Sequence, residues 1–174
     1  MARLCLISLG LMVLGPDGRA ADDKTFQNWS LRCDTVTTEG QAGCFVYQDL
    51  VLREDGQRVM QFAVGYVQGT NAPVALLSLP LGISLPPGAQ LEIPEREPIE
   101  ITIERCDPTG CRGGFRIEDE LLAALLAAQT MTITFHDRNR KPIQVPLSMA
   151  GFTAGFAALP DAGELPSALA RPSL

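Results

Sequence analysis

Cysteines and a single histidine are the residues of this chain best suited to bind metal, form disulfides or act as nucleophiles. Four of the five cysteines lie in two close pairs, Cys33 with Cys44 and Cys106 with Cys111. A zinc site needs closely spaced thiols or several histidines, but neither pair has the C-x-x-C spacing and His136 is the only histidine. The spacing also argues against a thioredoxin-type redox centre. We therefore expect structural disulfides, with no metal and no other cofactor.

Four cysteines can pair in three ways, and the segments between them favour one of the three. Each close pair spans a turn-rich segment, so a short loop closes at little entropic cost. Between the second pair, Asp107-Pro108 favours a turn and Gly110 supplies the backbone freedom that closes it. The sequence therefore predicts disulfides Cys33–Cys44 and Cys106–Cys111, the second of them at the tip of a β-hairpin.

A serine hydrolase is the enzyme class for which candidate residues can be named. His136 is followed by Asp137, and Ser148 lies downstream, but no G-x-S-x-G turn is present and the histidine belongs to the solvent face of a threonine-lined strand. Phosphate-binding loops, dinucleotide fingerprints and EF-hand loops are also missing from the sequence. The other acid/base candidates alternate along a strand, a pattern typical of carboxylates that face water: Glu95, Glu97, Glu100 and Glu104. We expect no catalytic residues and no enzymatic activity.

The N-terminal segment has the features of a secretory signal peptide. Arg3 precedes an apolar run over residues 4–14, and Gly18-Arg19-Ala20 offers small residues for cleavage. A membrane anchor would need about 20 apolar residues, more than this run supplies before Gly15-Pro16. We expect cleavage after residue 20, loss of Cys5 with the signal, and delivery to the periplasm or cell surface, with no transmembrane segment in the mature chain.

The mature chain is long enough for one domain, which we place at residues 21–159, followed by a C-terminal tail at 160–174. The formal net charge of −6 opposes binding to nucleic acid and to anionic lipid surfaces. An even number of remaining cysteines suits an oxidising compartment.

Alternating and continuous apolar patterns predict a mostly β protein with two short helices. Residues 74–79 are nearly all apolar, which is typical of a strand covered on both faces. Residues 121–128 predict a helix whose leucines pack on a sheet, and Phe152, Phe156 and Leu159 share a face of a second helix, with Ser148 as its N-cap. The other predicted strands cover residues 26–33, 45–52, 59–67, 90–93, 99–104, 115–117, 130–136 and 143–145.

Several short sequences occur in an order that resembles one bacterial family. Trp29 lies shortly before Cys33, Cys44 opens the next strand, residues 79–82 read Leu-Pro-Leu-Gly, the Cys106–Cys111 turn follows, and residues 146–152 read Pro-Leu-Ser-Met-Ala-Gly-Phe. Together these resemble the invasion-associated locus B family of envelope proteins over about residues 26–159. The resemblance implies an immunoglobulin-like β-sandwich, two disulfides, export, no known enzyme activity and, for some members, a part in host-cell invasion.

The expected protein is therefore an all-β, immunoglobulin-like β-sandwich with two short helices and two disulfides. We expect the protein to be exported and non-enzymatic, and to act by binding an unidentified protein or envelope partner. A periplasmic carrier or chaperone for an apolar ligand is the alternative, because the leucine-alanine helix over residues 121–128 carries an apolar surface.

Overall fold

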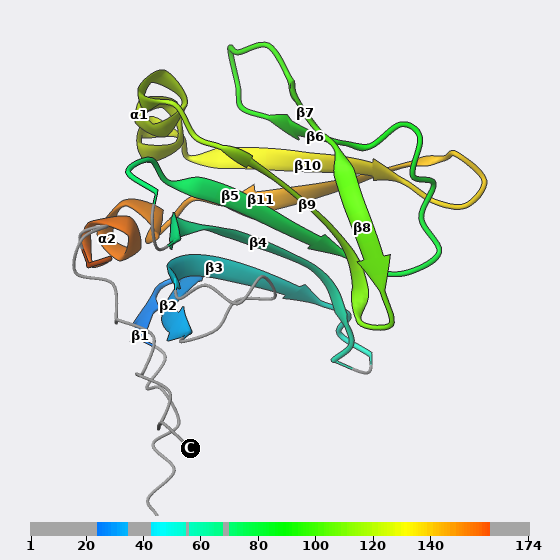
Figure 1. Cartoon of the computed structure of the whole chain (residues 1–174), viewed down its shortest axis with the longest axis horizontal. Helices are drawn as coiled ribbons and strands as arrows, with labels where there is room; N and C mark the ends of the chain where they lie inside the picture. Colours follow the sequence, from blue (N-terminus) through cyan, green and yellow to red (C-terminus); the bar gives the residue numbers. More distant parts are fainter. Residues whose placement is uncertain (1–23, 35–42, 55, 68–69, 161–174) are drawn as a thin grey trace, which may run out of the picture.

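The computed structural model describes residues 24–34, 43–54, 56–67 and 70–160, which form two antiparallel β-sheets and two short helices. The sheets pack face to face, and both helices lie at the same end of the sandwich (Figure 1). This arrangement confirms the predicted two-sheet β fold with two helices and two disulfides, and is consistent with an immunoglobulin-like sandwich. The expected signal peptide and most of the expected tail lie outside the described residues.

The larger sheet has seven strands, of which the first five follow one another as a meander. Their spatial order is β1 (Lys24–Phe26), β2 (Trp29–Asp34), β3 (Gly43–Val51), β4 (Arg58–Val67), β5 (Val74–Leu79), β9 (Gly110–Arg116) and β8 (Ile103–Asp107). Strands β3 and β4 pair antiparallel, which confirms the predicted hairpin, and Asp55 of the predicted Asp-Gly turn lies outside the described residues.

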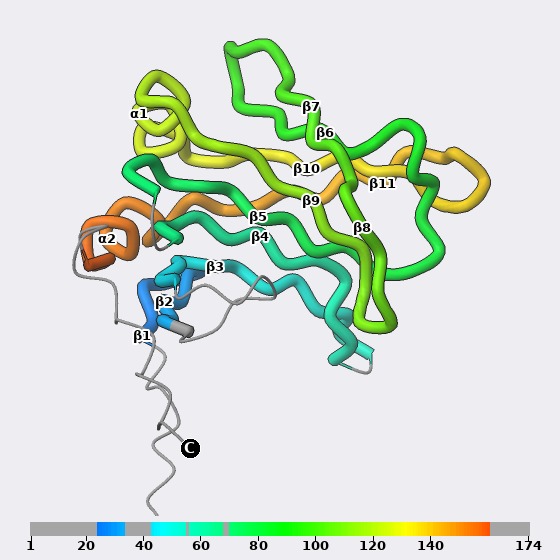
Figure 2. Tube along the Cα trace, viewed as in Figure 1, coloured from blue at the N-terminus to red at the C-terminus, as the bar shows by residue number. Residues whose placement is uncertain are grey.

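The smaller sheet has four strands in the order β11 (Pro142–Ser148), β10 (Thr130–His136), β6 (Ala89–Glu92) and β7 (Ile99–Ile101). The chain enters this sheet after β5, returns to the larger sheet for β8 and β9, and then forms helix α1 (Asp119–Ala127) before β10, a course that can be followed in Figure 2. Helix α2 (Phe152–Ala157) follows β11 and packs against β1, β2 and β3.

The core lies between the sheets and is built from alternate strand residues. Met60, Phe62 and Val64 of β4 are almost completely buried, as the period of two in a half-buried strand requires. Trp29 is fully buried, and its ring lies 4.8 Å from that of Phe152 and 6.5 Å from that of Phe62. Packing of α1 against this core is also confirmed, with Leu125 buried and its other leucines half-buried.

Both disulfides join residues directly opposite each other on neighbouring strands. Cys33 of β2 is bonded to Cys44 of β3, and Cys106 of β8 is bonded to Cys111 of β9. These are the pairs that the sequence predicts. The second bond closes the β8–β9 hairpin at the edge of the large sheet.

Two predicted strands are each divided in the structure. The expected strand over residues 26–33 is wrong, because the chain reverses after Phe26, with Gln27 at φ 52°, and β1 pairs back onto β2. The expected strand over residues 99–104 switches sheets at Thr102, so β7 and β8 belong to different sheets. Ile99, Ile101 and Ile103 all pack on the common core, which is why their alternation continues across the switch.

Two further expectations concern side-chain roles, and both are wrong. Ser148 ends β11 and does not cap α2, whose N-cap is Gly151 in a left-handed conformation. Strand β5 is buried on one face only: Leu77 points into the core, whereas Leu76 is 38% exposed on the opposite face. The nearly continuous apolar sequence of β5 therefore serves a core on one side and an open surface on the other.

Candidate functional site

The open face of the seven-stranded sheet is organised into three rows of side chains that cross five strands. The pairing register aligns Arg32, Phe45, Gly65, Val74 and Arg116 in the first row. The second row is Ser30, Tyr47, Ala63, Leu76 and Gly114. The third row is Asp49, Gln61, Ser78, Arg112 and Arg105. Arginines therefore lie in the two outer rows, while the central row contains no charged residue.

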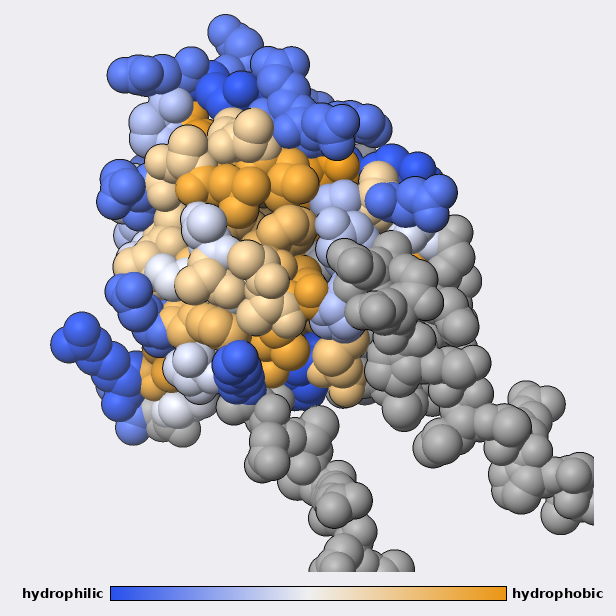
Figure 3. Space-filling view, turned by 90° about the vertical axis from the view of Figure 1, so that its left-hand side faces the viewer, coloured by the Kyte–Doolittle hydropathy of each residue, from blue (hydrophilic) through white to orange (hydrophobic). Residues whose placement is uncertain are grey.

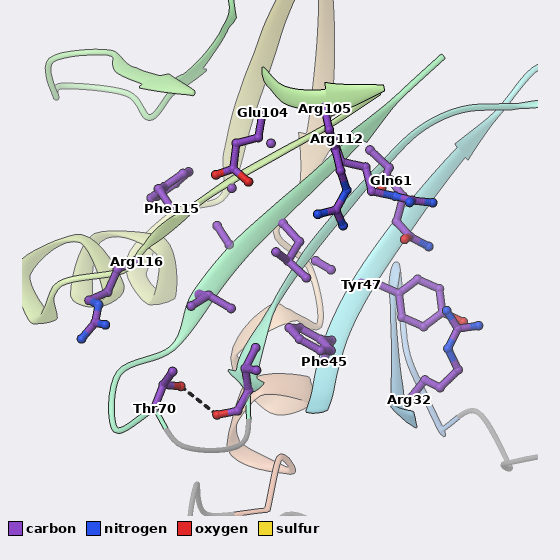
Figure 4. Close-up of a pocket in the computed structure, with 18 of the residues that line it drawn as sticks. Arg32, Phe45, Tyr47, Gln61, Thr70, Glu104, Arg105, Arg112, Phe115 and Arg116 are labelled. Carbon is purple, nitrogen blue, oxygen red and sulfur yellow. Dashed lines mark hydrogen bonds between the residues drawn. The ribbon is translucent and has the colours of Figure 1, made fainter. Parts of the chain in front are cut away.

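These rows line a groove of about 610 Å³ on this face of the sheet (Figure 4). Ala63 and Gly114 have little or no side chain, so the sheet surface is recessed at the central row. Larger residues in the two outer rows form the sides of the groove. The lining residues come from β2, β3, β4, β5, β8 and β9, and from Thr70 before β5: Arg32, Phe45, Tyr47, Arg58, Gln61, Ala63, Val67, Thr70, Val74, Ala75, Leu76, Ser78, Glu104, Arg105, Arg112, Gly113, Gly114, Phe115 and Arg116.

Positive charge is concentrated in the groove of an otherwise acidic chain. Five of the 14 lysine and arginine residues line it, against one acidic lining residue, Glu104, while Arg58 is paired with Asp49 of the third row and Arg112 with Asp107. The guanidinium of Arg32 lies 4.9 Å from the centroid of the Tyr47 ring, a distance suited to a cation–π contact. Arg116 is exposed at the opposite end of the same row and makes no ion pair with any acidic residue that the structure describes (Figure 4).

The stapled hairpin fixes the position of Arg112 at the third row. Arg112 Nη1 lies 2.6 Å from Asp107 Oδ2, and its Nη2 donates to Thr109 Oγ1 at 2.9 Å. Hydrogen bonds from the Thr109 side chain and main chain, with a smaller contribution from the positive charge of Arg112, lower the pKa of Asp107 below its ordinary value. The turn therefore holds an ionised carboxylate that orients one arginine of the groove.

Apolar side chains lie between the arginines on this face. Leu76 is exposed in the central row, while Val74 is half-buried and Phe45 buried in the first row. Phe115 pairs with Ala75 and packs against the core, so only the edge of this residue borders the groove. Gly114 allows Leu76 to lie low, since a Cβ at residue 114 would lie 3.1 Å from Leu76 Cδ2 and 2.7 Å from the Ala75 carbonyl oxygen. The site offers guanidinium groups for anions beside an apolar strip.

The hydrolase candidates do not assemble into a site. His136 and Ser148 lie at opposite ends of the β10–β11 pair, six residues apart in register, or about 20 Å. His136 is half-buried and its Nδ1 is buried without a hydrogen-bond partner, while Asp137 Oδ1 accepts main-chain bonds from Asn139 and Lys141. This histidine and this serine therefore do not form a catalytic pair.

The surface glutamates have different surroundings from one another. Glu95, Glu97 and Glu100 are exposed at β7 and the turn before it, and only Glu104 reaches the groove. Within the described ranges, no group of three or more histidine, cysteine, aspartate or glutamate side chains is arranged to hold a metal ion.

The groove residues were not identified from the sequence. Arg112 and Arg116 are four residues apart on β9, so they share one face of that strand, and this spacing is a detectable signal. The alignment with Arg32 depends on four successive strand pairings, which sequence spacing does not determine.

A second surface feature is apolar and lies at the helical end of the sandwich. Figure 3 shows a broad hydrophobic face at this end, bordered by hydrophilic side chains. Helix α1 has only Leu125 fully buried, and α2 exposes Ala154 and Ala157. Neither helix, nor any other in the part of the chain that the structure describes, is long and apolar enough to cross a membrane.

Comparisons with known proteins agree with one another. The family model described as invasion associated locus B (IalB) protein matches residues 29–160. Invasion protein B homologs of Brucella abortus, from strain 2308 and from biovar 1 strain 9-941, are each 26% identical over 142 residues, covering 81% of this chain and 80% of the homolog. The crystal structure of invasion associated protein b from Bartonella henselae superposes with a TM-score of 0.63 at 23% identity, covering 76% of this chain and 90% of that one.

Proposed function

Since the chain belongs to the invasion associated locus B family, we propose that it is an exported, non-enzymatic protein that binds a protein or envelope component through the groove on its seven-stranded sheet. Export to the periplasm or cell surface is supported by the two disulfides, which persist in oxidising compartments. The invasion-associated names of the Brucella relatives support a role at the host interface.

The proposal rests on the exposed apolar residues on the outer face of the large sheet. The solvent-exposed face of a strand usually carries polar residues at every second position, yet β5 has Val74 and Leu76 on this face. Arginines border this apolar strip on both sides, which gives the face the composition of a recognition surface. No side chain in the groove is arranged for nucleophilic attack, so binding explains these residues better than catalysis does.

The test is retention of an envelope component by the purified mature protein. Immobilised wild type and a Leu76→Glu/Arg116→Glu variant are incubated with envelope extract, and bound material is identified by mass spectrometry. Arg138→Glu, a charge reversal in the β10–β11 turn outside the groove, is the matched control. We expect wild type and the control to retain the same component and the groove variant to lose it. Equal retention by all three proteins would contradict the assignment of function to the groove.

A carrier or chaperone for an apolar ligand is a second candidate, favoured by the apolar face at α1 and α2 (Figure 3). On this hypothesis a lipid or apolar peptide copurifies with the mature protein. Native mass spectrometry of protein from the exported fraction distinguishes the two functions. Bound lipid that is lost after Leu122→Glu but kept after Leu76→Glu favours the carrier, because Leu122 belongs to α1 and Leu76 to the groove.

A further inference from the structure

Resting on the proposed function, we infer that the groove recognises an extended polypeptide segment in which acidic residues are separated by apolar ones. The inference depends on how the arginines are spaced, on what lies between them, and on the open shape of the site. Each of these excludes a different class of anionic ligand.

The positive charges of the groove lie too far apart for one small anion to bridge them. Arg32 and Arg116 belong to the same row but are separated by four strand spacings, or about 19 Å. Arg112 and Arg116 are four residues apart along β9, or about 13 Å. A single phosphate or carboxylate can reach only one of these positions. An extended chain of about six residues spans the longer distance, so the ligand carries several separated charges.

An apolar central row separates the two charged rows. Leu76 and Ala63 pair with each other in this row, and Val74 lies next to Leu76 on the same face of β5. An acidic polysaccharide could pair with the arginines but would leave Leu76 and Val74 against water. Successive side chains of an extended chain point to opposite faces, so a peptide whose every second residue is in turn acidic and apolar presents both kinds of side chain to the groove.

Leu76, at the centre of the groove, is not enclosed by the residues around it. It keeps 38% of its surface exposed, so the groove contacts a ligand from one side only. A lipid acyl chain gains most from enclosure in a pocket, whereas a peptide side chain packs adequately on an open sheet face. The guanidinium groups also hold carboxylates well, since their planar fork can donate two parallel hydrogen bonds.

Glu104 provides an internal check on this charge complementarity. Among the described residues that line the groove it is the only acidic one, and it lies beside Phe115 on the β8 side (Figure 4). An acidic ligand is repelled by this carboxylate, so its neutralisation strengthens binding. A ligand that is recognised only through apolar contacts is indifferent to the same substitution.

The experiment measures binding of a defined peptide by fluorescence anisotropy. The probe is a fluorescein-labelled peptide of eight residues with glutamate at positions 1 and 7, leucine or valine at positions 3 and 5 and threonine elsewhere, so that its acidic and apolar side chains share one face of the extended chain. Two comparison peptides replace the acidic residues by lysine or the apolar residues by serine. We expect the probe to bind the mature protein, both comparison peptides to bind at least about tenfold more weakly, and the affinity to fall about fivefold or more between 50 and 300 mM NaCl.

Single substitutions then assign the binding to the groove. Arg116→Ala and Leu76→Ser should each lower the affinity for the probe by about three- to tenfold, and Glu104→Gln should raise it by about two- to fivefold. Arg138→Ala, outside the groove, leaves the affinity unchanged. All three groove positions are exposed, so circular dichroism and melting curves of these variants should match those of the wild type.

The possible failures are distinguishable from those of the proposed function. Tighter binding of the serine peptide or of vesicles containing anionic phospholipid would overturn the acidic-apolar peptide as the ligand class. If no peptide binds while Leu76→Glu/Arg116→Glu still loses its envelope component, the peptide assignment is overturned and the proposed function stands. A probe affinity that does not change in any groove variant would overturn the site itself.

Discussion

The indole nitrogen of Trp29 lies 3.0 Å from the main-chain carbonyl oxygen of Ser148 and donates a hydrogen bond to it. The Gln48 amide donates to the same oxygen at 3.2 Å and to the Asn28 carbonyl at 3.0 Å. Trp29 and Gln48 come from the seven-stranded sheet and Ser148 comes from β11, so this oxygen links the two sheets. The link holds β2 and β3 against the segment that leads into α2.

The shared oxygen predicts that Trp29 and Gln48 are energetically coupled. Trp29→Phe or Gln48→Met leaves Ser148 with one side-chain donor, whereas the double variant removes both. We expect the double variant to lose about 0.5 to 2 kcal/mol more stability than the sum of the singles, measured by urea unfolding. Trp29→Phe combined with Leu52→Ala, at an exposed position, should be additive. Additivity of Trp29→Phe with Gln48→Met would show that the two donors act independently.

Strands with a strict local pattern could be predicted from the sequence. Residues 130–136 and 74–79 coincide with β10 and β5, because alternation or apolar continuity is decided within the strand. The family resemblance is confirmed as well, since it depends on motifs whose order does not require the fold to be known. The passage of the chain from one sheet to the other at Thr102 could not be predicted. Strands β7 and β8 face the same core, so the alternation of apolar and polar residues continues from one strand into the next.

The groove could not be predicted because it is created by register. Arg32, Phe45, Val74 and Arg116 are far apart in the sequence and are aligned only when five strands pair. The apolar side chains of Val74 and Leu76 also suggested a covered strand face. An exposed apolar face and a buried one have the same hydrophobic pattern, so only the exposure of Leu76 in the folded chain distinguishes them.

Leu76 and Leu77 test which face of β5 is the core. Leu77 is 1% exposed and Leu76 lies in the groove. We expect Leu77→Ala to lower the free energy of unfolding by about 2 to 5 kcal/mol, and Leu76→Ala to lower it by less than about 1 kcal/mol. Chemical unfolding of the two variants measures the difference. Similar losses would mean that the outer face of β5 is covered.

The two disulfides are expected to differ in their contributions to stability. The Cys33–Cys44 disulfide closes the longer loop. It lowers the conformational entropy of the unfolded chain, which destabilises that state by about 3 kcal/mol. The Cys106–Cys111 hairpin is already ordered by Asp107, which accepts from the Thr109 main-chain nitrogen at 2.7 Å, so its bond removes less freedom. Double serine variants of each pair, compared by melting temperature, should show the larger decrease for Cys33/Cys44. An equal or reversed order would contradict this argument.

Asp107 is expected to make stability depend on acid pH. Its pKa is lowered chiefly by the Thr109 hydrogen bonds, so the ionised form is favoured by folding. This contribution is complete above the ordinary value of 3.8 and is lost as the pH falls through the lower value of the folded state. Asp107→Asn should therefore melt below the wild type at pH 7, with a difference that narrows below about pH 4. A difference that stays constant from pH 7 to pH 2.5 would exclude the titration of Asp107 as its cause.

The Thr109 side chain provides the matched test of that mechanism. Thr109→Ala removes the largest cause of the lowered pKa and keeps the main-chain donor and Arg112. Titration of the Asp107 carboxyl by NMR should show its pKa closer to 3.8 in this variant than in the wild type. An unchanged titration would assign the shift to the Thr109 main-chain hydrogen bond and to the charges of Arg112 and Arg105 instead.

Gly151 is expected to be the least replaceable glycine of the helical end. It caps α2 at φ 92°, and a Cβ there would lie 1.9 Å from the Phe26 carbonyl oxygen. Gly56 also has a positive φ of 71°, but a Cβ there would meet no atom of the described chain within 4 Å. Gly56→Ala should therefore cost about 1 to 2 kcal/mol from backbone strain alone. Gly151→Ala adds a main-chain clash and should cost about 2 to 4 kcal/mol.

The emission of Trp29, the only tryptophan, separates these two effects. To relieve the clash, α2 must move away from β1, and this movement carries Phe152 away from the Trp29 ring, which it contacts at 4.8 Å. Water then reaches the indole, so Gly151→Ala should shift the folded-state emission to longer wavelength, whereas Gly56→Ala, at the distant β3–β4 turn, should not. Equal losses of stability with unchanged emission in both variants would show that backbone conformation, and not the approach of Phe26, makes residue 151 a glycine.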